Sequence, residues 1–312
     1  MTKIDVFSGF LGAGKTTLIK KLLKEGYDGE KLVLIENEFG EIGIDGGFMK
    51  DAGIEVTEMN QGCICCSLVG DFGKALKKVL DEYNPDRIII EPSGVGKLSD
   101  VIKAVMDVKS DEIVLNSYTT VCDASKIKMY MKNFGEFYKN QVETAKTIVL
   151  SRTQKLSEEK LAEAVAMIKE LNDHATIVTT NWDEISGKQI LAAMENENKF
   201  AEDLLKEELE HHDEHEHHHH HHADEVFTSF GVETAKKFTK EGLEAALSKL
   251  SGEEFGTVLR AKGIVAGENG WFEFDFVPEE YEIRAGSPDV TGKMCVIGSK
   301  LDEEKIKALF GV

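Results

Sequence analysis

The sequence predicts an α/β protein with a mostly parallel sheet covered by helices on both faces, followed by a small C-terminal α+β domain. Three observations lead to this fold class. Strand-like and helix-like segments alternate through the first half, a glycine-rich turn joins the first strand to the first helix, and the composition changes near residue 200. The length of 312 residues suits two domains, because a typical domain has about 150 residues.

The first half alternates between two kinds of segment. Short apolar runs, typical of parallel strands, occupy residues 4–8, 32–36, 54–59, 87–91, 120–123, 147–150 and 176–179. Helices are expected at residues 15–26 and 68–83, where apolar residues recur at helical spacing. Ligands of parallel sheets bind beyond the carboxyl ends of the strands. Motifs that follow these strands should therefore meet at one edge.

The second half is expected to hold a linker and a smaller domain. The predicted limits are 1–195 for the first domain, 196–225 for an acidic, histidine-rich linker and 226–312 for the second domain. Residues 213–225 carry no apolar stripe that could be buried, which is typical of a solvated segment. After it, helices are predicted at residues 241–250 and 302–310, and strands at 257–265, 271–277 and 294–297.

Charge and composition exclude several classes of partner. The net charge is −20, from 37 basic and 57 acidic residues, and such a surface repels nucleic acid and anionic membranes. The longest apolar runs are far shorter than the roughly 20 residues of a membrane span. The first residues lead directly into a strand, so no signal peptide is expected. The five cysteines are odd in number and three of them are clustered, which disfavours a disulfide framework and favours a cytoplasmic protein.

The first strand is followed by a phosphate-binding motif. Residues 9–16 read GFLGAGKT and fit the pattern G-x-x-x-x-G-K-[ST] between a strand and a helix. Backbone N–H groups of such a loop surround phosphates, and the helix N-terminus adds favourable partial charge. Lys15 is expected to reach the β- and γ-phosphates, and the Thr16 hydroxyl to hold Mg²⁺. The nucleotide contacts assigned to this loop are Gly9, Gly12, Ala13, Gly14, Lys15, Thr16 and Thr17.

A second acidic motif ends the strand at residues 87–91. Residues 88–94 read IIIEPSG, which places Glu91 at the strand's carboxyl end. Many strands end in an acid, but together with the upstream loop this glutamate is expected near Mg²⁺ and the γ-phosphate.

The third strand is followed by a cysteine motif, Asn60-Gln61-Gly62-Cys63-Ile64-Cys65-Cys66. Thiolates suit Zn²⁺ and similar soft ions, and Zn²⁺ prefers four ligands. Glu36 and Glu41 are candidates for the remaining positions. Two alternatives stay open: a redox pair, since Cys63 and Cys66 have C-x-x-C spacing, and small buried core residues. The remaining two cysteines, Cys122 and Cys295, are expected to be core residues in apolar strands.

A histidine tract lies in the predicted linker. Imidazoles bind Zn²⁺, Ni²⁺ and Co²⁺ well, so the tract is expected to collect such ions, with an inert linker as the alternative. An engineered tag is disfavoured because a whole domain follows. His174, the one histidine of the ten that lies outside the tract, is expected to be partly buried. The tract comprises His211, His212, His215, His217, His218, His219, His220, His221 and His222.

These motifs, in this order, resemble the CobW-like P-loop GTPases, which are related to the nickel-insertion GTPases of urease and hydrogenase maturation. The most specific shared part is GCICC at residues 62–66, between the phosphate loop and the second acidic motif. The resemblance implies a GTP-dependent metallochaperone or metal-insertion factor for zinc, cobalt or nickel. It further implies a first switch at residues 36–45, with Asp45 near the attacking water, and a metal site coupled to nucleotide state.

One segment departs from the family pattern. Family members usually carry N-K-x-D or T-K-x-D after the strand at 147–150, whereas this chain has Ser151-Arg152-Thr153-Gln154. These residues are still expected to bind the base, with Arg152 stacking on it. Gln154 is neutral, and the loss of a charge-assisted pair of hydrogen bonds weakens recognition by roughly 1.5–3 kcal/mol. GTP is therefore the expected nucleotide, with ATP left open.

The combined prediction is a slow GTPase that transfers a transition metal to a client metalloprotein or a cofactor-synthesis protein. Slow turnover is expected because no arginine finger is evident in the sequence. A nucleotide-dependent dimer is left open. Two alternatives remain: an ATP-driven activator of a cobalt-cofactor protein, and a metal-buffering protein with little hydrolysis.

Overall fold

The computed structural model describes residues 1–36, 55–58, 69–108, 110–195, 228–278 and 280–312. The chain divides into two compact units, Met1–Glu195 and Asn196–Val312, which are described separately below.

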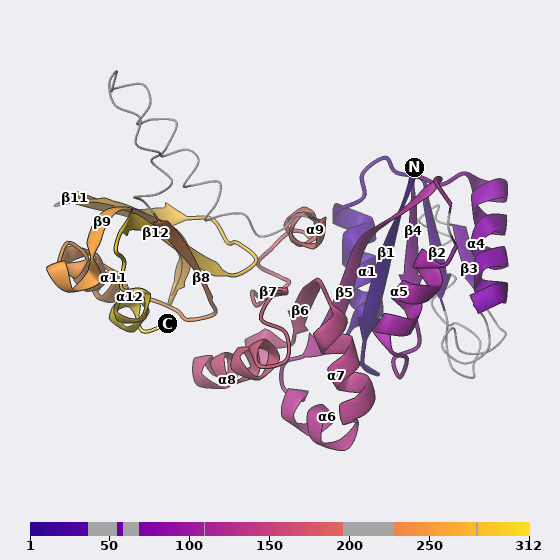
Figure 1. Ribbon diagram of the computed structural model, residues 1–312, viewed down its shortest axis with the longest axis horizontal. Helices are drawn as coiled ribbons and strands as arrows, with labels where there is room; N and C mark the ends of the chain where they lie inside the picture. The colour runs from indigo at the N-terminus through magenta and orange to yellow at the C-terminus, as the bar shows by residue number, and fades with distance from the viewer. Residues whose placement is uncertain (37–54, 59–68, 109, 196–227, 279) are drawn as a thin grey trace. The chain divides into compact units, whose positions relative to one another are not determined.

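The first unit is built on a seven-stranded sheet in the order β3-β2-β4-β1-β5-β6-β7 (Figure 1). Every neighbouring pair in it is parallel. Its strands are β1 (Thr2–Gly9), β2 (Leu32–Glu36), β3 (Glu55–Glu58), β4 (Arg87–Glu91), β5 (Ile113–Asp123), β6 (Thr147–Ser151) and β7 (Thr176–Val178). The predicted fold class is confirmed for this unit.

Helices cover both faces of this sheet. Successive residues of a strand point to opposite faces, and a strand whose successive residues are all buried must therefore be covered on both sides. Ile88, Ile89 and Ile90 of β4 are all fully buried. Helices α1 and α9 pack together, whereas α4, α5, α7, α6 and α8 form a second series of contacts. The helices are α1 (Lys15–Glu25), α4 (Val69–Tyr83), α5 (Leu98–Met106), α6 (Ile127–Asn133), α7 (Gly135–Thr144), α8 (Glu158–Lys169) and α9 (Gly187–Glu195).

Strand β5 begins seven residues before the predicted start at 120, at Ile113. Asn116 and Ser117 interrupt the apolar pattern there, which hid the strand in the sequence. The structure explains both residues, since each donates a hydrogen bond to Asp5 Oδ1 of neighbouring β1, at 2.8 and 2.7 Å.

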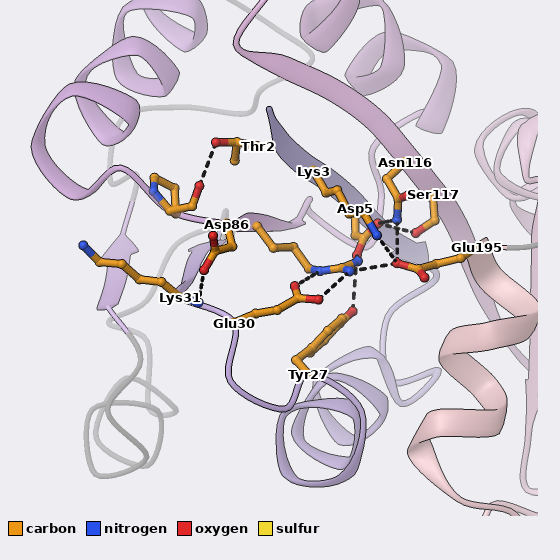
Figure 2. Close-up of polar contacts among 12 residues, drawn as sticks. Thr2, Lys3, Asp5, Tyr27, Glu30, Lys31, Asp86, Asn116, Ser117 and Glu195 are labelled. Carbon is orange, nitrogen blue, oxygen red and sulfur yellow. Dashed lines mark hydrogen bonds and ion pairs between the residues drawn. The ribbon is translucent and has the colours of Figure 1, made fainter.

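A partly buried polar cluster lies between these strands and the end of α9 (Figure 2). The Arg87 guanidinium contacts Asp5, Glu30 and Glu195, and its side chain is only 1% exposed. Glu195 also accepts hydrogen bonds from Lys3 Nζ and Asn116 Nδ2, both at 3.2 Å. The carboxylates neutralise a guanidinium that would otherwise be costly to bury. Arg87 thereby joins β1, β4, the segment after α1 and the last residue of α9.

The second unit has a five-stranded antiparallel sheet in the order β11-β10-β9-β12-β8. Its core includes Leu243 and Leu247 of α11, Phe310 of α12 and Phe274 of β10. The predicted small α+β domain is confirmed, but β8 and β11 were missed; both are edge strands with few buried residues. The elements are β8 (Thr228–Thr234), α11 (Lys240–Lys249), β9 (Thr257–Gly267), β10 (Gly270–Val277), β11 (Glu280–Gly286), β12 (Gly292–Ser299) and α12 (Glu303–Phe310).

Within the described residues, no helix combines the length and the apolar character required to cross a membrane.

Candidate functional site

The glycine-rich loop connects β1 to α1 with backbone angles that favour glycine. Gly12 has φ 68° and Gly14, the residue that precedes α1, has φ 108°. Gly9 has φ 140°, and a Cβ placed on it would lie 2.4 Å from the carbonyl oxygen of Val121. Only glycine lets β1 turn this closely past β5. The loop therefore has the form that a phosphate cradle at a helix N-terminus requires.

Lys15 and Thr16 meet Glu91 at the start of α1. Lys15 Nζ donates to the carbonyl of Gly9 at 3.1 Å and lies 3.8 Å from Glu91 Oε1. Thr16 Oγ1 lies 3.4 Å from both carboxylate oxygens of Glu91. An ammonium group, a hydroxyl and a carboxylate thus converge beside the loop. Hydroxyl and carboxylate oxygens are the hard ligands that Mg²⁺ prefers, so these residues fit a magnesium nucleotide.

Three glutamates end three neighbouring strands at one level. Glu36 of β2 is in register with Glu91 of β4 on one side and with Glu58 of β3 on the other. Glu36 is buried, with 8% of its surface exposed. Adjacent strands lie about 4.8 Å apart, so acidic positions continue along the sheet edge from the phosphate loop. Glu58 was not singled out in the sequence, although its place at a predicted strand end was a usable signal.

The segment after β6 is attached to the phosphate loop. Ser151 Oγ donates to the carbonyl of Ala13 at 2.6 Å, and Arg152 Nη2 donates to the carbonyl of Gly12 at 2.9 Å. Arg152 Nη1 also donates to Asp123 Oδ2 at 2.7 Å. Two predicted base-binding residues therefore contact the loop backbone, while Gln154 is exposed.

Two residues that had no predicted site role, Asp123 and Trp182, also lie here. Asp123 ends β5, is 1% exposed, and accepts hydrogen bonds from the backbone and hydroxyl of Ser125 as well as from Arg152. Its position at a strand end was a usable signal. Trp182 follows β7, and its indole Nε1 donates to the carbonyl of Leu150 at 2.9 Å. No local pattern pointed to Trp182, because its contacts are made by residues distant in sequence.

Several predicted site residues lie outside the described part of the chain. They are Glu41, Asp45, Cys63, Cys65, Cys66 and the nine histidines of the tract. Among the residues that are described, no group of three or more His, Cys, Asp or Glu side chains is arranged to hold a metal ion.

The two isolated cysteines are core residues, as predicted. Cys122 and Cys295 are fully buried and free of disulfides. Burial raises the pKa of each thiol to about 12, so neither is a thiolate at neutral pH. The expectation for His174 was wrong: its side chain is 94% exposed, 3.2 Å from Asp173.

The fold and this site together define the chain as a P-loop nucleotide-binding protein of the NTPase class. Residues 3–179 match the family described as CobW/HypB/UreG, nucleotide-binding domain. Residues 227–312 match the family described as Cobalamin synthesis protein cobW C-terminal domain. The first match spans more than half of the sequence, and the chain belongs to the CobW/HypB/UreG family.

Individual relatives carry names that refer to zinc. "Zinc chaperone YjiA" of Escherichia coli K12 is 29% identical over 98% of this chain and 97% of that protein. "Zinc chaperone CobW" of Sinorhizobium sp is 41% identical over 39% of this chain and 36% of that protein. "Zinc-regulated GTPase metalloprotein activator 1" of Schizosaccharomyces pombe is 31% identical over 62% of this chain, and the match spans 50% of that protein. A crystal structure of Zn(II)-bound YjiA GTPase from E. coli aligns with a TM-score of 0.46 at 23% identity, over 99% of this chain and 98% of that one.

Proposed function

We propose that this protein is a GTP-hydrolysing metallochaperone that binds a transition metal, zinc first among the candidates, at Cys63, Cys65 and Cys66. It passes the metal to a client metalloprotein or to a protein of cofactor synthesis. The membership of the CobW/HypB/UreG family supports this proposal, as do relatives named as zinc chaperones and as a zinc-regulated GTPase activator. The clustered thiols suit a reducing cytosol.

The register of Glu58, Glu36 and Glu91 carries the proposal. Glu91 contacts Lys15 and Thr16 of the phosphate loop. The chain leaves β3 at Glu58, and the cysteine motif follows shortly in the sequence. A metal held by these thiolates with Glu36 as an oxygen ligand would have a mixed sulfur and oxygen ligand set, which suits Zn²⁺ or Co²⁺.

The same residues suit hydrolysis of a nucleoside triphosphate. Mg²⁺, when bound, supplies neutralising charge for the β- and γ-phosphates. Lys15, which now contacts the Gly9 carbonyl, would hold the phosphates, and the Thr16 hydroxyl would be a ligand of the cation. Glu91, adjacent to both, would help to hold the cation, and Asp45 would orient the attacking water. Turnover by these residues alone is slow, and a partner supplies further stabilisation of the transition state.

Metal release requires that the two nucleotide states bind the metal with different affinity. Glu36 is the residue that links the two sites, because it is in register with Glu91 and is the first residue of the segment assigned as the first switch. Loss of the γ-phosphate changes the charge beside Glu91 and thereby the environment of Glu36. The histidine tract collects ions for this site.

The deciding experiment measures metal affinity in each nucleotide state. Zn²⁺, Co²⁺ and Ni²⁺ are titrated against a chelating indicator in the presence of Mg²⁺ with GDP, a non-hydrolysable GTP analogue or the matching ATP analogue. We expect at least a tenfold affinity difference between the GDP and GTP-analogue states, and a change in GTP hydrolysis when metal is added. The double variant Cys65→Ala, Cys66→Ala loses both effects, whereas Cys295→Ala, a matched control outside the motif, keeps them.

Other outcomes select the alternatives. Equal metal affinity in all nucleotide states, with metal-independent hydrolysis, would indicate a metal-buffering protein and refute the proposal. A response to the ATP analogue but not to the GTP analogue would favour an ATP-driven activator of a cobalt-cofactor protein. Light scattering in the same samples tests for a nucleotide-dependent dimer.

A further inference from the structure

The segment after β6 is held against the phosphate loop by hydrogen bonds of Ser151 and Arg152. It carries Gln154 where the family pattern has an aspartate. Arg152 has a left-handed backbone with φ 60°. Its guanidinium donates hydrogen bonds to the Gly12 carbonyl and to the buried carboxylate of Asp123. The Ser151 hydroxyl donates a hydrogen bond to the Ala13 carbonyl. The positive charge of Arg152 is thus neutralised within the protein. Gln154, exposed on the following turn, is neutral and offers a single acceptor oxygen.

Trp182 borders the phosphate loop and the segment after β6. A Cβ placed on Gly14 would lie 3.4 Å from Cη2 of Trp182 and 3.7 Å from Cβ of Ser151. The indole is half-buried, and its N–H is already donated to the carbonyl of Leu150. Its accessible part is therefore an apolar aromatic surface beside the loop. Stacking of a base on such a ring contributes about 5- to 150-fold in affinity and does not depend on base edge chemistry.

A comparison of guanine with hypoxanthine shows which protein groups recognise the hydrogen-bonding edge of the base. Both carry the O6 acceptor and the N1–H donor, and guanine alone adds the 2-amino donor. A carboxylate accepts from N1–H and the 2-amino group together, so it favours guanine strongly. A neutral amide with one acceptor oxygen cannot serve both donors equally well, and an aromatic ring senses neither.

We propose that Trp182 is the residue that gives this site its affinity for a purine, and that the chain does not discriminate the 2-amino group of guanine. Guanine and hypoxanthine nucleotides then bind with similar affinity. This inference rests on the proposed function, since it concerns the same nucleotide site. It adds a base-binding residue and a broader purine substrate class.

Another carboxylate among the described residues could bind the guanine edge in place of an acid at residue 154. Asp123 is already paired with Arg152. Asp183 and Glu184 follow Trp182 directly and are exposed. If Asp183 replaced the missing acid, guanine would be selected and Asp183→Asn would abolish that selection.

The test uses the full chain with Trp271→Phe, which leaves Trp182 as the single tryptophan of the two in the sequence. GDP and IDP are titrated with Mg²⁺ while indole fluorescence is followed, and affinities are measured by competition with a fluorescent GDP derivative. We expect both nucleotides to change the Trp182 signal and their affinities to differ by less than about tenfold. Trp182→Ala should weaken both by about 5- to 150-fold without changing their ratio.

A gain-of-selectivity variant completes the test. Gln154→Asp should raise the preference for GDP over IDP by about 10- to 150-fold. Gln154→Asn, a neutral control with a side chain as long as that of aspartate, should leave the preference unchanged. Trp182→Phe, which keeps an aromatic ring, should retain most of the affinity, so a folding defect in Trp182→Ala can be recognised by comparison.

A wild-type preference for GDP of tenfold or more, or an Asp183→Asn variant that loses such a preference, would overturn the inference. An unchanged affinity in Trp182→Ala would overturn it as well. These failures leave nucleotide binding intact. Failure of the proposed function would instead appear as no binding of GDP at all, or as metal affinity that is equal in all nucleotide states.

Discussion

Single residues at the phosphate loop are constrained by backbone as much as by chemistry. Lys15 and Thr16 supply the reactive groups, but their position depends on how closely the chain turns at Gly9. The carbonyl of Val121 lies where a side chain at Gly9 would be, and φ at Gly9 is 140°. Gly29 offers a comparison, because it also has positive φ, at 76°, but has open space around it.

Gly9→Ala is expected to lower the free energy of unfolding by about 3 kcal/mol or more, because strain and a backbone clash add. Gly29→Ala should cost only about 1 kcal/mol, from its backbone angle alone. Urea unfolding measures both values, and binding of a fluorescent GDP derivative measures the site. Equal losses in the two variants would contradict the role assigned to the Val121 contact.

At the scale of elements, the polar cluster around Arg87 fixes the end of α9. Burial opposes ionisation of Glu195, but hydrogen bonds from Arg87 and Lys3 outweigh it and leave the pKa of Glu195 below its ordinary value of 4.5. Burial likewise opposes the charge of Arg87, while its bonds to Glu30 and Asp5 keep its pKa raised. Helix α9 is therefore held by charge in addition to apolar packing (Figure 2).

Glu195→Gln is expected to remove part of this attachment. A carboxylate with a lowered pKa in the folded state contributes stability that is complete above its unfolded pKa of about 4.5 and is lost as pH falls through the lower folded pKa. The wild type should thus lose stability more steeply below pH 4.5 than the variant does. At pH 7 the variant should be less stable by about 1 kcal/mol, with faster amide exchange in the last turn of α9.

The control for this prediction is Glu82→Gln, which alters an exposed pair with Lys78 at 3.8 Å. Such surface pairs contribute little. If both variants showed the same pH profile as the wild type, the assigned role of Glu195 would be refuted.

At the scale of the whole molecule, each unit contains its own apolar core. The first unit has a core that includes Ile4, Val33, Ile88 and Leu150, and it also carries every described residue of the nucleotide site. The second unit has a separate core around Leu243 and Phe274. A unit with its own core is able to fold alone.

A fragment of residues 1–195 is therefore expected to fold cooperatively and to bind GDP with Mg²⁺ within about threefold of the full chain. Circular dichroism during thermal unfolding and calorimetric titration test this expectation. Lys15→Ala in the same fragment is the control for specific binding. A fragment that unfolds without a cooperative transition, or that binds nucleotide at least tenfold more weakly, would assign the second unit a role in the nucleotide site.

Local sequence patterns were sufficient for most of the first unit. Apolar runs mark parallel strands buried on both faces, and residues 9–16 specify a phosphate loop whose conformation depends mainly on their own backbone. The same patterns missed the first part of β5 and the edge strands β8 and β11. Those segments are stabilised by partners distant in sequence, or face solvent, and lack an apolar period.

Contacts across the fold decided the rest, since they join residues far apart in the chain. The sequence placed Arg152 at a base, but its bonds to Asp123 and Gly12 depend on how three strand ends meet. Trp182 lies at the site because its ring is beside Gly14 and its N–H is donated to Leu150 in the folded chain. The carboxylates that contact Arg87 come from three separate segments. Sequence motifs identify the side chains that can bind nucleotide or metal. The distances that let these side chains act together are set by tertiary packing.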